Sequence, residues 1–266
     1  MAIRTEKIGT MEDLTAAGIG ASHCFTTRLG GVSEGIFASL NLRYNGGDDV
    51  KNVEKNYTLL ANALGFSMEN LVVTRQTHSD IVRAVTKADA CGINNRNYPE
   101  SDALVTNDPG CAIGIFTADC TPILLHDPVT GAVGAAHAGW RGTVAKIAAK
   151  TALAMMEHFG CQRSNIRAAI GPNIAQCCFE TDRDVPDAAL AAFGDGAKPH
   201  IRQKGNKYYV NLKALNALAL QEVGVQNIEI SDVCTYCQHD RYWSHRFTGE
   251  NRGTQGAFIL RKEERL

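Results

Sequence analysis

The sequence predicts an α+β fold, with strands and helices mixed along one domain over residues 1–266. Three observations lead to this prediction. Short apolar runs alternate with segments whose apolar residues recur every three or four positions, the patterns of buried strands and amphipathic helices. Several expected strands are joined by short turns that suit antiparallel pairing. No linker rich in Pro, Gly or Ser, low-complexity tract or solenoid-type repeat divides the chain.

Composition excludes several classes of protein. Hydrophobic residues make up 44% and charged residues 21% of the 266 residues, which is enough apolar material for a core. The net charge of -1 gives no electrostatic footprint for nucleic acid or an anionic membrane surface. No apolar run approaches the roughly 18 residues that span a bilayer, and the first residues lack the pattern of a secretory leader. We therefore expect a cytoplasmic protein without nucleic-acid or membrane partners, whose nine cysteines are reduced thiols.

The first half is expected to contain one long helix among short strands. Glycine-punctuated residues 23–42 are predicted to form a loop. A helix begins after Asp48 or Asp49, which can cap it, and ends at Gly65. Its apolar face consists of residues at helical spacing, namely Val53, Tyr57, Leu60, Ala61 and Leu64. Strands are expected at residues 71–73, 81–85 and 102–106, and a surface loop at 91–101, which contains Asn94, Asn95, Asn97 and Pro99.

Two apolar runs within residues 112–143 are the stretch around which the chain is expected to be organised. The first runs into Asp119 and Cys120, and the second runs into His137. Between them, residues 127–131 (DPVTG) favour a tight turn. The stretch is either two buried strands with a loop, or two strands whose ends bring Cys120 and His137 together for metal binding or catalysis.

The second half is expected to continue with helices and strands. An amphipathic helix is predicted over residues 144–159, ending at Gly160. Asn211 is expected to cap a later helix that turns Leu212 and Leu215 inward. The remaining predictions are a helix at 185–193, strands at 166–170, 208–210, 228–230 and 257–260, and a polar, aromatic segment at 234–252.

Three residues at the ends of expected strands are candidate metal ligands: His78, Cys120 and His137. Zinc accepts imidazole nitrogen and thiolate sulfur, and a site with three protein ligands leaves one position open for water or substrate. The same atoms suit covalent catalysis, with Cys120 as nucleophile, His137 as its base and His78 or Asp119 as an orienting group. Each of the three could instead be an ordinary structural residue, as a hydrogen-bonded histidine or a buried cysteine. The spacing in the sequence does not distinguish metal binding, covalent catalysis and a structural role.

Arginines beside these residues indicate an anionic or oxygen-rich substrate. Arg75 lies three residues before His78, and Arg141 lies four residues after His137, at the start of a helix whose N–H groups favour anions. Ordinary salt bridges are the alternative for both. Trp140 would stack on a ring or pack in a core.

Four further cysteines stand out by spacing. Cys234 and Cys237 form a CxxC, the spacing of a redox pair or half a zinc site, but no second CxxC accompanies them. A structural or incidental role is therefore favoured for this pair. Cys177 and Cys178 are adjacent and cannot easily bridge to each other.

Taken in order, the motifs resemble those of the laccase-domain family, also called YfiH-like or multicopper polyphenol oxidase. They are SLNL (39–42), GDD (47–49), QTH (76–78), DALVT (102–106), TADCTPILL (117–125), HAGWRGT (137–143), IGPNIAQCCFE (170–180) and the late CTYC, SHR and RGTQGAFI stretches. The match covers nearly the whole chain, and TADC and HAGWRG are its most specific parts. The chain departs from the family pattern at Arg43, where Gly is common, and at residues 242–246, where YWSHR replaces an aromatic-rich FFSYR run.

The resemblance implies a single-domain layered sandwich with mixed β-sheets flanked by helices. It implies a zinc ion held by His78, Cys120 and His137, with copper less favoured. It also implies a purine nucleoside phosphorylase that splits adenosine, inosine, guanosine and methylthioadenosine with phosphate, and that can deaminate adenosine.

Within such an enzyme the other predicted site residues have substrate roles. The predicted substrate contacts are Asn41, Arg75, Arg141 and Cys178. The two arginines would anchor phosphate or ribose, because a guanidinium binds phosphate bidentately. Asp119 is predicted to protonate, or hydrogen-bond to, the departing base.

Three alternatives remain. A peptidoglycan-editing amidase that removes L-Ser from a UDP-muramyl precursor would suit a Cys–His arrangement equally well. A copper-dependent polyphenol oxidase ranks last among the enzymes, because several coppers need many His ligands and this chain has eight His without an HxH pairing. A metal-stabilised binding scaffold is the non-enzymatic alternative, although structural zinc sites usually have four protein ligands.

Overall fold

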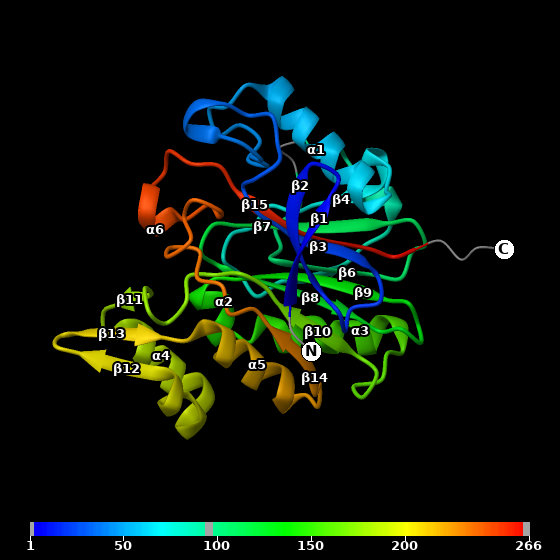
Figure 1. Ribbon diagram of the computed structural model, residues 1–266. Helices are drawn as coiled ribbons and strands as arrows, with labels where there is room; N and C mark the ends of the chain where they lie inside the picture. The colour runs from blue at the N-terminus through cyan, green and yellow to red at the C-terminus, as the bar shows by residue number, and fades with distance from the viewer. Residues whose placement is uncertain (1–2, 94–97, 263–266) are drawn as a thin grey trace.

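Two six-stranded sheets lie at the centre of the computed structural model, which describes residues 3–93 and 98–262 (Figure 1). The first sheet contains, in spatial order, β1 (Ile3–Ile8), β2 (Met11–Ala16), β3 (Ser22–Thr26), β15 (Gln255–Leu260), β7 (Ala112–Thr117) and β4 (Leu71–Val72). The second contains β14 (Asn227–Ile230), β10 (Arg167–Ile170), β8 (Thr121–His126), β9 (Val133–Ala138), β6 (Ala103–Thr106) and β5 (Val82–Ala84). Most neighbours are antiparallel, but β4–β7, β5–β6 and β10–β14 are parallel. The predicted mixed fold is confirmed.

Helices cover the outer faces of both sheets. In Figure 1, α1 (Val50–Leu64) lies above the first sheet, and α3 (Ile147–Phe159) and α5 (Leu212–Glu222) lie below the second. The other helices are α2 (Trp140–Val144), α4 (Asp184–Phe193), α6 (His245–Thr248) and the 3-10 turns Gly35–Phe37, Met68–Asn70, Lys87–Asp89 and Gly194–His200. A third, small sheet of β11 (Glu180–Thr181), β13 (Lys207–Val210) and β12 (Ile201–Lys204) lies beside α4. None of the helices in the part of the chain that the structure describes is long and apolar enough to cross a membrane.

The central strands are buried on both faces, which explains why their sequences are continuous apolar runs. In β8, Ile123 and Leu125 pack in the core beneath α3 and α5, whereas Leu124 packs between the two sheets. In β15, Ala257 and Ile259 face the second sheet. Because successive side chains of a strand point to opposite faces, every position of these strands meets apolar neighbours.

The capping predictions are confirmed in detail. The Asp49 side chain accepts a hydrogen bond from the Lys51 N–H at the start of α1, and Gly65 ends the helix in the left-handed conformation at φ 78°. Asn211 caps α5 by accepting from the Ala214 N–H. The turn at residues 127–131 joins β8 to β9, where Gly131 has φ 75°.

Two element predictions are wrong. Residues 23–26 of the expected loop belong to β3, a strand that pairs with β2 on one side and β15 on the other, so that pairing on both edges outweighs the nearby glycine signals. The helix expected over 144–159 is broken at Lys146, which takes φ 59°, so α2 and α3 are separate helices. In the loop expected at 91–101, residues 94–97 lie outside the described residues.

Asp13 in β2 is a buried carboxyl whose oxygens have no hydrogen-bond partner within residues 3–93 and 98–262. Burial raises its pKa from 3.8 to about 7. Below pH 4 both the folded and the unfolded chain carry this proton. As the pH rises from about 4 to 7, the unfolded chain releases this proton and the folded chain keeps it. The free energy of unfolding therefore falls, by an amount on the order of 4 kcal/mol.

Replacement of Asp13 by Asn is therefore expected to raise the melting temperature at pH 8 and to change it little at pH 4. The measurement is thermal unfolding at both pH values. Asp195→Asn, at a side chain that is 90% exposed, serves as the control. An equal effect of Asp13→Asn at both pH values would show that the buried charge is not the cause.

Candidate metal centre and adjoining cavities

The structure brings His78, Cys120 and His137 together where strands of the two sheets end. Cys120 lies in the short connection between β7 and β8, and the pairing of Pro122 with His137 sets β9 directly beside it. His78 comes from the segment between β4 and β5. One ligand atom from each residue lies within 4.8 Å of the others, and Cys120 Sγ is 3.7 Å from His78 Nε2. We call these three residues the three-ligand cluster.

Asp102 is the residue that holds this arrangement in place. Its carboxylate accepts hydrogen bonds from the N–H groups of Thr77, His78 and Ser79, at 2.7–3.1 Å, and from the Ser79 hydroxyl at 2.6 Å. The same carboxylate is 2.7 Å from His137 Nδ1. Asp102 therefore ties the segment that carries His78 to the strand that carries His137.

The hydrogen bond to Asp102 also orients His137. In the neutral ring, with Nδ1 donating to the carboxylate, the other ring nitrogen, Nε2, is the acceptor and can bind a metal ion. A histidine fixed in this way by a carboxylate is the usual arrangement around protein-bound metals. Residue Asp102 was not singled out from the sequence, since it acts through His137 and contributes no ligand atom of its own.

The electrostatics of the cluster favour a thiolate. Burial would raise the pKa of Cys120, but His137 and His78 outweigh burial and lower it. Burial would lower the pKa of His137, but the charges of Cys120 and Asp102 raise it. For Asp102 itself, burial is outweighed by the hydrogen bonds from His137 and Ser79, which hold its pKa well below the usual range.

The backbone around the cluster is strained. His78 has φ 60° and Asp119 has φ 82°, left-handed conformations that side chains other than glycine rarely adopt. Such outliers persist where surrounding contacts enforce them, often at functional sites. Gly139 shows how tight the space is, since a Cβ there would lie 2.7 Å from His78 Cδ2 and 3.3 Å from Cys120 Sγ.

The donor set fits a zinc ion. Two imidazoles and one thiolate are ligands that zinc accepts, and three protein ligands are typical of catalytic sites that keep one position open. Cys120 is half-buried and His78 exposed, so substrate can reach the cluster. The Asp102–His137 hydrogen bond supplies the outer support that such ligands need.

Two cavities adjoin the cluster and share His78, Ala118, Cys120 and His245. The aromatic cavity, about 340 Å³, is lined by His78, Ala118, Asp119, Cys120, Gly139, Trp140, Arg141, Ile174, Phe179, Leu212, His245 and Arg246. The polar cavity, about 420 Å³, is lined by Gln76, His78, Phe116, Thr117, Ala118, Cys120, His137, His245, Glu250, Arg252 and Thr254. The three-ligand cluster thus lies between two cavities, each of which can hold one small reactant or part of a larger one.

Among the predicted substrate contacts, Arg141 reaches the site. It lines the aromatic cavity, and its guanidinium lies 4.3 Å from the centre of the Trp140 ring. Arg75 lies outside the lining of both cavities and forms an exposed ion pair with Glu100 at 2.6 Å. Trp140 is half-buried against the aromatic cavity.

The other three predicted site residues hold neighbouring segments together. Asn41 is fully buried; it donates to Asp48 and accepts from the Arg43 and Thr254 N–H groups. Asp119 lines the aromatic cavity, but its carboxylate accepts from the Thr235 hydroxyl and the Arg246 N–H, at 2.6 and 2.7 Å.

Cys178 lies outside the lining of both cavities, with its sulfur 3.3 Å from that of Cys237.

Several cavity residues were not predicted as site residues. Arg246 and Arg252 add cationic side chains, and His245 borders both cavities. The hydroxyls of Thr117 and Thr254 have no hydrogen-bond partner in the part of the chain that the structure describes. Buried polar atoms without partners beside a cavity are candidates for contact with a ligand.

The chain is similar to known proteins in sequence and in fold. The family model described as "Multi-copper polyphenol oxidoreductase laccase" matches residues 22–262. A purine nucleoside phosphorylase from Bacteroides thetaiotaomicron is 36% identical over 238 residues, which cover 87% of this chain and 88% of that protein. Adenosine deaminase RL5, from an unknown prokaryotic organism, is 36% identical over 254 residues, which cover 93% and 97%. The crystal structure of YlmD from Geobacillus stearothermophilus matches with a TM-score of 0.92 at 34% identity, covering 99% of this chain and 100% of that chain.

Proposed function

The chain belongs to the family described as multi-copper polyphenol oxidoreductase laccase, and on this basis we propose that it is a zinc-dependent purine nucleoside phosphorylase acting as one domain over residues 1–266. Relatives named purine nucleoside phosphorylase and adenosine deaminase support an enzyme that acts on nucleosides. The observation that carries the proposal is the position of the three-ligand cluster between two cavities, one of them with arginines and aromatic rings. The proposed substrates are adenosine, inosine, guanosine and methylthioadenosine.

Phosphorolysis needs room for two reactants on opposite sides of one carbon. A phosphate oxygen attacks C1′ of the ribose while the bond from C1′ to the purine nitrogen breaks and its electron pair leaves with the base. Two cavities that meet at the cluster suit this geometry, because they hold the nucleophile and the leaving group on either side of the ribose.

Phosphate is assigned to the aromatic cavity, where Arg141 and Arg246 supply positive charge. The Arg141 side chain is exposed, and within the described residues its guanidinium contacts only the Trp140 ring, which leaves its N–H groups available to an anion. Arg246 already donates from Nη1 to the Glu180 carbonyl, so it is the more fixed of the two. The nucleoside is assigned to the polar cavity, where the hydroxyls of Thr117 and Thr254 can pair with it.

The departing purine needs a proton or a hydrogen bond on its leaving nitrogen. His245 borders both cavities, and its Nδ1 accepts from Arg252 Nε at 3.4 Å, which leaves Nε2–H as the donor in the neutral ring. We assign this contact to His245. Asp119 then acts by fixing the backbone of Arg246 through the Arg246 N–H.

A zinc ion held by His78, Cys120 and His137 would supply Lewis acidity toward a substrate atom and would lower the pKa of a bound water. That chemistry would also serve deamination of adenosine. The chain's own contribution is to hold the two imidazoles and the thiolate in place through Asp102.

Replacement of Arg141 by Ala is expected to raise the apparent KM for phosphate at least about tenfold, since a charged hydrogen bond contributes roughly 1.5–3 kcal/mol. The KM for the nucleoside should change less. The measurement is release of free base over a range of phosphate concentrations. Arg183→Ala, at the exposed residue just before α4, is the matched control, and Arg75→Ala tests the second arginine predicted from the sequence. An unchanged phosphate dependence in Arg141→Ala would remove its assigned role.

A second function is favoured by one observation. The low pKa of Cys120, the raised pKa of His137 and the bond from His137 to Asp102 form a Cys–His–Asp arrangement, which could serve a peptidoglycan-editing amidase. Incubation with a muramyl nucleotide precursor that carries L-Ser distinguishes the two. Release of serine without phosphate-dependent release of free base from any of the four nucleosides would favour the amidase.

The family description suggests copper oxidation, but the ligand groups of the described residues fit it poorly. Within residues 3–93 and 98–262, the groups that could hold a metal are the three-ligand cluster and a group of four cysteines. A multicopper oxidase needs several His-rich sites close together. The three-ligand cluster has only two histidines, so copper oxidation is the least supported activity.

A further inference from the structure

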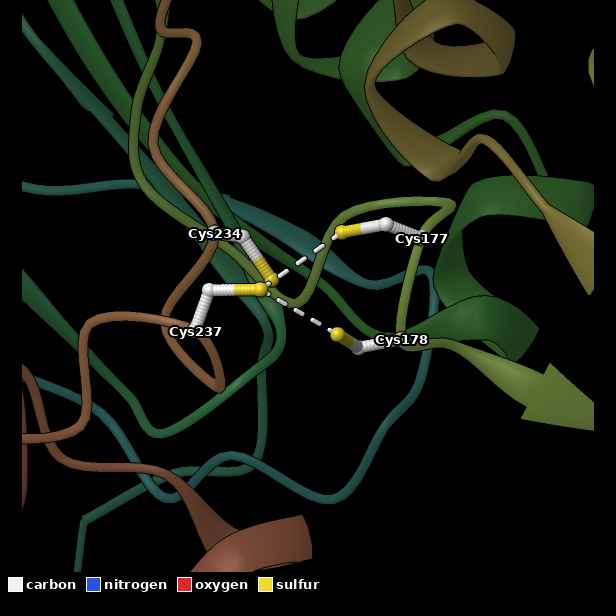
Figure 2. A group of neighbouring side chains, drawn as sticks. All are labelled: Cys177, Cys178, Cys234 and Cys237. Carbon is white, nitrogen blue, oxygen red and sulfur yellow. Dashed lines mark hydrogen bonds between the residues drawn. The ribbon is translucent and has the colours of Figure 1, made fainter.

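Four cysteine sulfurs converge outside both cavities (Figure 2). Cys177 and Cys178 come from the segment after β10, and Cys234 and Cys237 come from the segment after β14. One sulfur atom from each residue lies within 4.8 Å of the others. All four residues are free cysteines in the structure, and we call them the four-cysteine cluster.

Strand pairing explains why these distant residues meet. β10 and β14 are parallel neighbours that end together, with Ile170 paired to Ile230. Their following segments stay side by side, because Ser231 N–H donates to the Ile170 carbonyl and Thr235 N–H donates to the Asn173 carbonyl. The two cysteine pairs are therefore carried by segments that leave the same edge of the second sheet.

The spacing of the sulfurs suits a single ion. Four thiolates at about 2.3 Å from a tetrahedral zinc ion lie about 3.8 Å from one another. Cys177 Sγ lies 3.8 Å from Cys237 Sγ, and Cys178 Sγ lies 3.3 Å from it. The sulfurs are thus nearly placed for tetrahedral coordination, and small side-chain rotations would complete it.

The surroundings of Cys234 favour a thiolate. The Ala175 N–H donates to Cys234 Sγ at 3.3 Å, a bond that favours negative sulfur. Lys213 is buried beside Cys234, and its ammonium donates to the carbonyls of Ser231 and Val233 at 2.7 and 2.6 Å. Its charge would offset part of the negative charge that four thiolates leave on a divalent ion. Cys177 and Cys237 are exposed, which gives a metal ion a path of entry.

We propose that the four-cysteine cluster is a second, structural metal site that binds one zinc-class ion through four thiolates. Binding displaces four thiol protons to solvent, and no electron is transferred. Four protein ligands close the coordination sphere, which is the pattern of structural rather than catalytic zinc. A structural metal site would be one form of the structural or incidental role that the sequence favours for Cys234 and Cys237.

The proposed ion would fix one wall of the aromatic cavity. Cys178 is followed directly by Phe179, which lines that cavity, and Cys234 is followed by Thr235, which donates to Asp119. A metal ion that links the two segments would fix the positions of Phe179 and Asp119 relative to each other. The proposal concerns metal binding alone and holds whether or not nucleosides are the substrate.

Metal content of the whole protein tests the proposal. Protein produced with added zinc is freed of loose metal, and bound zinc per chain is measured for wild type, for the double variant Cys178→Ser/Cys237→Ser, and for Cys91→Ser, an exposed cysteine outside both clusters. The double variant is expected to hold about one zinc fewer than wild type and Cys91→Ser. Equal zinc in all three would overturn the proposal, as would disulfides linking Cys177 or Cys178 to Cys234 or Cys237 in protein kept from oxidation.

If the double variant does not fold, the proposal can still be tested by replacing zinc with cobalt and measuring the absorption of the bound cobalt. Thiolate-to-cobalt absorption grows with the number of thiolates, and the three-ligand cluster has only one. A His78→Ala variant loaded with cobalt is therefore expected to keep the intense absorption of a four-thiolate site. Loss of that absorption in His78→Ala, or its absence from the cobalt-loaded wild type, would contradict a four-cysteine site.

Discussion

Asp102→Asn is expected to lower the affinity of the three-ligand cluster for zinc by about 10–100-fold, the usual cost of losing a carboxylate that supports a metal-bound histidine. Five hydrogen-bond donors converge on the Asp102 carboxylate, including His137 Nδ1 and the His78 N–H. The Asn side chain has the same size, but its NH₂ group would face some of these donors and could not accept their hydrogen bonds. The buried donors that lose their acceptor would each cost about 1–3 kcal/mol, so the variant should also unfold at lower temperature.

The matched control is Asp127→Asn, at another fully buried aspartate in the turn between β8 and β9. One oxygen of Asp127 accepts from the Val129 and Thr130 N–H groups and the other has no partner among the described residues, so an amide can replace it without facing a donor. Zinc titration and thermal unfolding of both variants are the measurements. If Asp102→Asn binds zinc as tightly as Asp127→Asn does, Asp102 does not organise the site.

Cys120→Ser is expected to remove zinc from the three-ligand cluster and to reduce nucleoside cleavage at least about 100-fold, because a neutral hydroxyl is a much weaker zinc ligand than a thiolate. The nearly isosteric change should leave the fold intact, since Cys120 is only half-buried. Bound zinc and the rate of free-base release are measured on the same sample.

The combination of the two readouts separates a ligand from a nucleophile. A Cys120→Ser protein that binds as much zinc as wild type but loses activity would point to covalent catalysis by the thiol, as in the amidase alternative. Cys161→Ser is the control, because Cys161 lies outside the lining of both cavities, and its sulfur lies 3.2 Å from the Thr130 hydroxyl, a contact that a serine hydroxyl can keep. It should retain both zinc and activity.

The elements with regular periodicity and clear caps could be predicted from the sequence. The helix between Asp49 and Gly65 was found because its cap, its apolar face and its terminal glycine agree with one another. The strand β3 was missed because its apolar residues are few and glycines follow closely. Its stability comes from pairing on both edges, with β2 and β15, which local sequence does not reveal.

In the site, too, contacts between residues near in sequence could be predicted, and contacts between distant segments could not. Cys120 and His137 could be related to each other because a short hairpin joins their strands, so their proximity follows from local pairing. Asp102 was missed because its role depends on a contact between segments that only the fold creates. The four-cysteine cluster was missed because the parallel pairing of β10 with β14 joins residues nearly 60 positions apart. The sulfur of Cys178 lies 3.3 Å from that of Cys237, and the substrate contact predicted for Cys178 stays a prediction.

The most direct test of the central claim is the fate of phosphate when zinc-loaded protein is incubated with inosine. Phosphorus-31 NMR follows inorganic phosphate and ribose 1-phosphate, while free hypoxanthine is measured in parallel. The proposal predicts one ribose 1-phosphate for each hypoxanthine released, and loss of both products in Cys120→Ser. Release of hypoxanthine with free ribose, or no release from inosine or the other three nucleosides, would contradict phosphorolysis at this site.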